Sequence, residues 1–157
     1  MDINFTKKYL DNLLAAVKKI MLERSLGTDF NFYSMYLENE DYKKKMEKDY
    51  KKKKFKSIII TADKFSQSTK NGNTQKTQTY KIRVCNENKD QDAGFEETMN
   101  IASNIIDSFT KNPLATQKKD GYSYHINLDN ITGQLNEELT VGDYWVYEIF
   151  VTLDLPL

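Results

Sequence analysis

Cys85 and His125 are the two side chains that could form a nucleophile and its base, because an imidazole can activate a neighbouring thiol. The chain contains one cysteine and one histidine. They fall on different predicted strands, and no third group is indicated that would orient the histidine. An ordinary surface histidine is therefore the favoured interpretation of His125, and catalysis by this pair is disfavoured.

Patterns that bind metals or phosphates are also missing from the sequence. His125 has no second histidine or cysteine at ligand spacing, and none of the six glycines precedes a helix in the spacing of a phosphate loop. The adjacent carboxylates Glu96-Glu97 and Glu137-Glu138 are typical of helix-cap and turn residues. We predict no catalytic residue, no metal and no cofactor, and therefore a protein that is not an enzyme.

Length and composition predict a single domain over residues 1–157. The chain has 39% apolar and 12% aromatic residues, enough for one core. It contains no run of about 18 apolar residues, and its N-terminus lacks the apolar segment of a signal peptide. We expect a protein without membrane contact, made in the cytoplasm, where one unpaired cysteine is usual.

The net charge is zero, but the charges are unevenly distributed along the chain. Residues 1–84 carry 19 Lys and Arg against 10 Asp and Glu, whereas residues 85–157 carry 4 against 13. Such polarity is typical of a basic segment that meets nucleic acid, or of copies that pack head to tail. The two halves could also simply neutralise each other within one fold, and this simpler interpretation ranks first.

The segment from Asp92 to Pro113 is predicted to be the amphipathic helix around which the fold is organised. Asp92 is a candidate N-cap, and Pro113 prevents continuation. A narrow apolar stripe needs a flat apolar partner, so we expect this helix to lie on a sheet. The residues of the stripe are Phe95, Met99, Ala102, Ile105, Ile106 and Phe109.

A second helix is predicted from Phe5 to Arg24, with Gly27 suited to a left-handed C-terminal cap. Its apolar face consists of Tyr9, Leu10, Leu13, Leu14, Val17, Ile20 and Met21. Residues 28–55 follow as a basic arm or insertion with nine lysines between residues 39 and 56, and its first part, DFNFYSMYL, alternates loosely like a short strand or an extended arm. A solvated surface is the favoured interpretation of this stretch, although Lys51, Lys52, Lys53 and Lys54 are candidates to meet phosphates or an acidic partner.

Strands are predicted on both sides of the organising helix. Residues 55–65 and 78–86 form the first pair, and Asn71-Gly72 between them suits a tight hairpin turn. The polar residues around this dipeptide predict a longer, mobile tip that becomes ordered against a partner, with Asn71 and Asn73 facing it. Residues 121–136 form a third strand, residues 137–142 a turn, and residues 143–155 the closing strand.

The closing strand has one apolar face and one mixed face. The mixed face presents Tyr144, Val146, Glu148 and Phe150, which we predict to form a subunit interface, unless a helix of the same chain covers them. The complete pattern predicts an α+β fold, with two main helices packed on an antiparallel sheet of about four strands.

Four segments of the chain resemble the tail terminator, or tail-completion (collar), proteins of long-tailed bacteriophages and phage-tail-like bacteriocins. These segments are YKIRVCNE, GFEETMNIASNIIDSFTKNP, GYSYHINL and DYWVYEIFVTLDLP, and the order of elements matches from Phe5 to Leu157. The match is one of element order without a signature residue, and residues 28–55 are longer and more basic than the family pattern.

The resemblance implies a structural protein of virion assembly. In that family an α+β subunit forms a homo-oligomeric ring, usually a hexamer, that caps the tail tube and connects it to the neck or collar. It implies as partners other copies of the chain, the tail tube, and sheath or neck proteins, with transient DNA contact, in an assembled particle. The candidates to face the tube, the sheath or DNA are then Lys51, Lys52, Lys53, Lys54, Asn71 and Asn73. Two alternatives stay open: a small nucleic-acid-binding or regulatory protein acting through residues 43–56, and a neighbouring neck or baseplate component.

Overall fold

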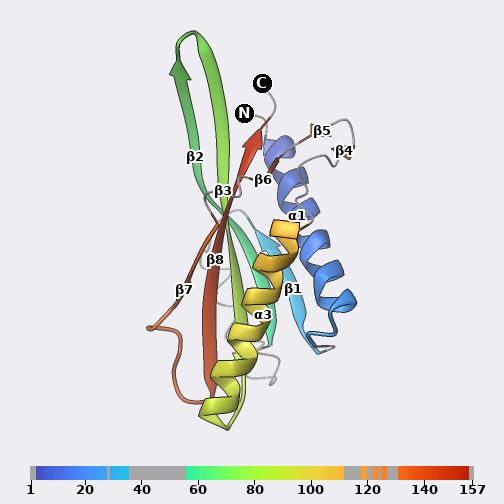
Figure 1. Cartoon of the computed structure of the whole chain (residues 1–157), viewed down its shortest axis with the longest axis vertical. Coiled ribbons are helices and arrows are strands. Elements are labelled where there is room, and N and C mark those ends of the chain that lie inside the picture. Colours follow the sequence, from blue (N-terminus) through green and yellow to red (C-terminus); the bar gives the residue numbers. More distant parts are fainter. Residues whose placement is uncertain are drawn as a thin grey trace.

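A computed structural model describes residues 3–27, 29–35, 56–111, 118–119, 122–123, 125–126 and 131–155 (Figure 1). Two long helices, α1 (Ile3–Glu23) and α3 (Gln91–Lys111), lie against a sheet. The strands of this sheet are β1 (Asn31–Met35), β2 (Ser57–Lys70), β3 (Asn73–Glu87), β6 (His125–Ile126), β7 (Thr132–Leu135) and β8 (Tyr144–Leu155). β4 (Lys118–Lys119) and β5 (Tyr122–Ser123) pair separately. The predicted α+β class is confirmed.

The sheet has the order β1-β2-β3-β8-β6, and β7 also pairs with β8. Every pair in it is antiparallel except β1 with β2, which run parallel. The prediction of an antiparallel sheet of about four strands is therefore confirmed in part, because the sheet is mixed and has additional strands. Strand direction depends on how the chain returns between β1 and β2, and alternation of side chains carries no information about direction.

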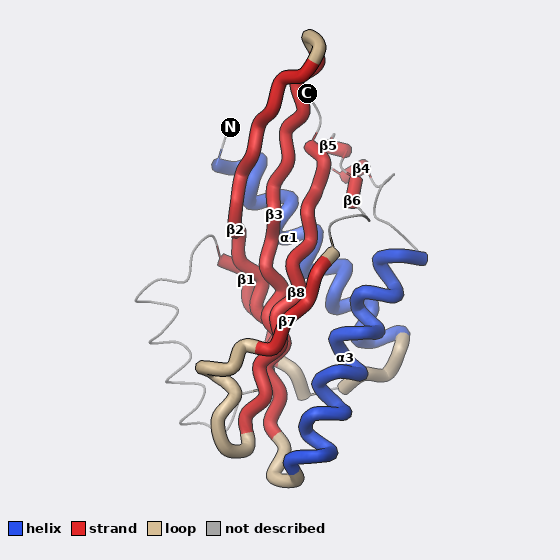
Figure 2. The backbone as a smooth tube through the Cα atoms, turned by 60° about the vertical axis from the view of Figure 1, so that its left-hand side comes forward, coloured by secondary structure: helices blue, strands red, loops and turns tan. Residues whose placement is uncertain are grey.

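One face of the sheet and both helices form the main core. The register aligns Ile60 with Ile82 and Ile82 with Ile149, so these side chains share a face. The helices contribute the following buried apolar residues to the same cluster: Leu10, Leu13, Val17, Ile20 and Met21 from α1, and Ile101, Ala102, Ile105 and Phe109 from α3. Figure 2 shows the two helices beside the strands that they cover.

The buried face of α3 is rotated relative to the predicted stripe. Thr98 and Ile101 are buried, whereas Phe95, predicted to face the core, is 46% exposed. The N-cap is also displaced, because Asp90 Oδ1 accepts a hydrogen bond from the Ala93 amide at 3.1 Å, and Asp92 lies inside the first turn. The predicted helix is confirmed, but its cap and orientation are corrected.

The end of α1 fixes its position against α3. Ser25 adopts φ 53°, and the Leu26 amide donates to the Met21 carbonyl at 3.0 Å, so Ser25 rather than the predicted Gly27 is the left-handed capping residue. The neighbouring Arg24 donates to Asn104 Oδ1 and to Asp107 Oδ2 of α3, both at 3.0 Å. The Arg24 hydrogen bond, followed by that of Lys111, lowers the pKa of the Asp107 carboxyl.

Candidate interaction surfaces

The β2–β3 hairpin extends far beyond the helices as an arm, which we define as residues 64–77 (Figure 1). A register shift between Ala62 and Lys64 marks its base. The strands run unbroken to a two-residue turn, with Asn71 at φ 53° and Gly72 at φ 79°. The tight turn is confirmed, and the longer tip predicted around it is wrong, because cross-strand pairing continues to Lys70 and Asn73.

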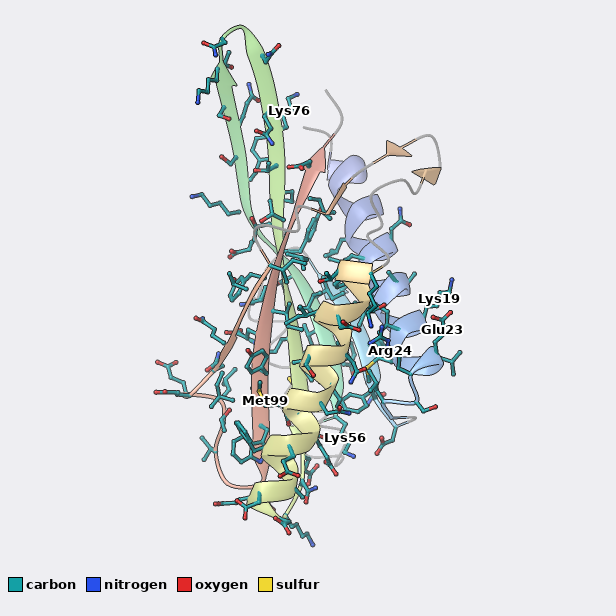
Figure 3. All side chains as sticks on the ribbon, in the orientation of Figure 1. Lys19, Glu23, Arg24, Lys56, Lys76 and Met99 are labelled. Atoms are coloured by element: carbon teal, nitrogen blue, oxygen red, sulfur yellow. The ribbon has the colours of Figure 1, made fainter. Side chains whose placement is uncertain are left out.

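The arm is polar and basic, and it makes little contact with the rest of the chain. Residues 63–73 are all exposed, and Phe65 is the single apolar side chain of the arm, with 42% exposure. Lys64, Lys70 and Lys76 are its only charged residues, and Lys76 is labelled in Figure 3. β8 accompanies β3 as far as Lys76, and on the outer edge of β2, away from β3, no described strand pairs beyond Thr61. Within the described part of the chain, the outer edge of β2 in the arm is therefore an open strand edge.

The opposite end of the molecule is acidic. We define this acidic end as residues 87–97, where β3 passes into α3, and residues 137–143, the loop between β7 and β8. The Asn88 amide donates to the Asp143 carbonyl at 2.8 Å, which holds the two segments together (Figure 1). The acidic end contains one basic residue, Lys89, and eight carboxylates: Glu87, Asp90, Asp92, Glu96, Glu97, Glu137, Glu138 and Asp143.

Apolar side chains are exposed among these carboxylates. Phe95, Leu139 and Val141 are 46%, 40% and 63% exposed. The Phe95 ring meets Trp145 edge to face at 5.7 Å between centroids. A side chain at position 94 would collide with the indole of Trp145, so Gly94 allows α3 to approach β8 closely. The acidic end is therefore an ordered part of the fold whose surface includes exposed apolar side chains.

The four residues predicted as a subunit interface lie on the sheet face opposite the helices. Val146 is fully buried with Ile59 and Cys85, and Tyr144 packs against this second cluster. Glu148 is 5% exposed, while Tyr144 and Phe150 are half-buried. The chain itself thus already buries two of the four side chains, and neither α1 nor α3 covers them.

A buried ion pair on this face was not found by sequence reasoning. Arg83 and Glu148 are cross-strand neighbours, and the guanidinium donates to Glu148 Oε2 through Nε at 3.0 Å and Nη2 at 2.7 Å. Lys81 Nζ lies 3.6 Å from the same oxygen, and Asn136 Nδ2 donates to Oε1 at 3.3 Å. The sequence indicates this ion pair only by charged residues of opposite sign on two predicted strands. Which of them are cross-strand neighbours depends on the register of the strands, and the sequence does not give that register.

The fold does not bring Cys85 and His125 together as a nucleophile and its base. Cys85 is buried, and it aligns with Val146 of β8, whereas His125 aligns with Asp154. Eight residues of extended strand separate these positions by roughly 25 Å. Among the described residues no group of three or more His, Cys, Asp and Glu side chains is arranged to hold a metal. Neither α1 nor α3 is long and apolar enough to cross a membrane.

The predicted basic contacts at Lys51, Lys52, Lys53 and Lys54 lie outside the described residues, as do residues 43–50 of the lysine-rich stretch. Asn71 and Asn73 lie at the tip of the arm. Comparison with protein-family models finds no matching family, and comparison with curated proteins finds no significant match.

Proposed function

We propose that this chain is a structural subunit of a phage-type tail, which forms a homo-oligomeric ring that caps the tail tube and connects it to the neck or collar. The observation that carries the proposal is the arm. A hairpin of 14 residues, in regular strand conformation except for its two-residue turn and with Phe65 as its single apolar side chain, contributes little to the core of its own subunit.

Ordering such an arm is energetically unfavourable for an isolated chain. Fixing the backbone of one residue costs about 1–2 kcal/mol in conformational entropy, and apolar burial offsets this cost elsewhere in the fold. In the arm, Phe65 is the only large apolar side chain, and it is 42% exposed. An extended, polar hairpin of this kind suits a subunit whose contacts lie with other molecules, as assembly into a particle requires.

The distribution of charge supports a ring. A closed ring uses a heterologous interface in which two different surfaces of each copy meet. The arm carries three lysines and no carboxylate, and the acidic end carries eight carboxylates and one lysine. Tyr144 and Phe150 remain a proposed contribution to this interface. The tube, sheath and neck are proposed as further partners, and Lys51–Lys54 as a transient DNA contact.

The mass of the purified protein, alone and mixed with tail tubes, tests the proposal. We expect closed rings, or monomers that become rings at tube ends, in light scattering and negative-stain images. A monomer that ignores tubes but binds DNA, with affinity that falls steeply with salt, would contradict the proposal. That result would favour the alternative of a nucleic-acid-binding protein acting through residues 43–56.

A further inference from the structure

The lysines of the arm have no acidic partners in the described part of the chain. Lys64 and Lys70 are exposed, Lys76 is half-buried, and none of the three forms an ion pair there. A surface that binds the arm must therefore place carboxylates near the three lysines. It must also offer hydrogen-bonding groups to the main chain along the open edge of β2.

Pairing of two arms with each other does not satisfy this requirement. An antiparallel, two-fold pairing of the β2 edges centred on Gln67 would place Lys64 of each copy opposite Lys70 of the other. Like charges directly opposite each other destabilise a strand pair. The lysines thus disfavour a symmetric arm-to-arm dimer and favour a contact between two different surfaces.

The acidic end has the complementary properties. Glu96, Glu137 and Glu138 are exposed, and the described residues provide none of them with an ion pair. The exposed apolar side chains of Phe95 and Val141 belong to the same acidic end and could cover Phe65 of an incoming arm. Because the arm and the acidic end lie at opposite ends of the long axis, one chain cannot join its own two surfaces (Figure 1).

We propose that the arm of one copy docks on the acidic end of the next copy, so that Lys64 and Lys70 meet carboxylates of this end, Glu137 and Glu138 among them. This inference rests on the proposed function, since it names the contact by which copies associate. The contact is heterologous, and the rotation between successive copies decides whether it closes into a ring or continues as a filament.

Paired charge reversals test the contact in the full chain. The arm variant is Lys64→Glu with Lys70→Glu, the acidic variant is Glu137→Lys with Glu138→Lys, and a third chain combines all four substitutions. The control, Lys18→Glu with Lys19→Glu, makes the same change in net charge at exposed positions of α1. Mass is measured by light scattering over a range of protein concentration, and folding is checked by circular dichroism.

We expect each reversal to raise the concentration needed for assembly about tenfold or more, in the range of close charge pairs. The combined chain recovers assembly, and the control assembles like the unmodified protein. An arm variant that assembles normally would overturn the docking contact and leave the ring intact. Filaments that depend on the arm lysines would support the contact and contradict the ring, and an unmodified chain that stays monomeric with tubes would contradict both.

A disulfide trap provides a second measurement that does not depend on charge. Lys70→Cys and Glu138→Cys are placed in one chain, where the buried Cys85 stays in its cluster. Oxidation should then produce a ladder of covalently linked copies. Cysteines at Lys19 and Glu138 serve as the control and should give no ladder. An absence of linked copies in assembled particles of the first variant would count against the proposed contact.

Discussion

The two halves of the β2–β3 hairpin have the same strand pairing but opposite environments. Ser57–Thr61 of β2 and Tyr80–Asn86 of β3 form its root, and nearly every side chain there is buried. Beyond the register shift at Ala62 and Lys64, the same strands form the arm, where residues 63–73 are all exposed. The hydrogen-bonded ladder thus continues after the hydrophobic support has ended.

This difference shows that strand pairing and burial have separate roles in the molecule. The root holds β2, β3 and β8 in register through Ile60, Ile82 and Ile149, and the helices cover these side chains. The arm holds its geometry through cross-strand pairs such as Thr69 with Thr74, whose hydroxyl oxygens lie 3.3 Å apart. We therefore expect substitutions in the root to change stability, and substitutions in the arm to change association.

The largest effect on stability is expected at the buried ion pair of the root. Arg83→Met leaves Glu148 buried, with Lys81 at 3.6 Å as its remaining cation. Removing one partner of a buried pair costs about 3–5 kcal/mol, and the remaining lysine should keep the loss near the lower limit. The loss in the free energy of unfolding is measured by urea unfolding, followed by the fluorescence of Trp145.

The matched control replaces a cation of the arm. Lys70→Met removes the same charge from an exposed position and should change the free energy of unfolding by less than about 0.5 kcal/mol. The double variant Arg83→Met with Glu148→Leu removes both charges and should recover much of the lost stability. If Arg83→Met were as harmless as Lys70→Met, the root and the arm would not differ in the way proposed.

Apolar truncation in the core should give an effect of similar size. Ile82 is fully buried between the helices and the neighbouring strands, so Ile82→Ala should cost about 2–5 kcal/mol, because the site cannot fully collapse. Phe65→Ala removes a larger side chain from the arm, yet Phe65 is 42% exposed, and the expected loss is below about 1 kcal/mol. Equal losses in urea unfolding would show that the arm has a core contact of its own.

The local features of the root were predictable from the sequence, whereas the arm was not. The two strands were predicted at residues 55–65 and 78–86, and Asn71-Gly72 predicted the turn, because both features depend on residues close in the chain. The residues of the arm were assigned to a mobile tip, since polar side chains carry no hydrophobic periodicity. Pairing between β2 and β3, which continues to Lys70 and Asn73, keeps them in strands, and β8 joins this pairing only at Lys76 and Thr77.

Long-range relations account for the remaining differences. The parallel direction of β1, the pairing of Arg83 with Glu148, and the gathering of residues 87–97 with residues 137–143 each join segments far apart in the sequence. Amphipathic periodicity identified α3, but it did not determine which side faces the sheet. Gly94 lets the helix approach Trp145, which turns Phe95 outward.

The smallest effect on stability is expected at the turn of the arm, where Gly72 has φ +79° and an added Cβ would meet no atom within 4 Å. Gly72→Ala therefore adds backbone strain alone, about 1 kcal/mol. Since the arm lacks a core, this strain should open the turn locally and accelerate amide hydrogen exchange in residues 66–76, with little change in global unfolding. Gly142→Ala is the matched control, because Gly142 has φ +64° and equally open surroundings in the loop before β8. If Gly72→Ala also accelerated exchange at Ile60 and Ile82, the hairpin would open as one cooperative unit, and the division between root and arm would not hold.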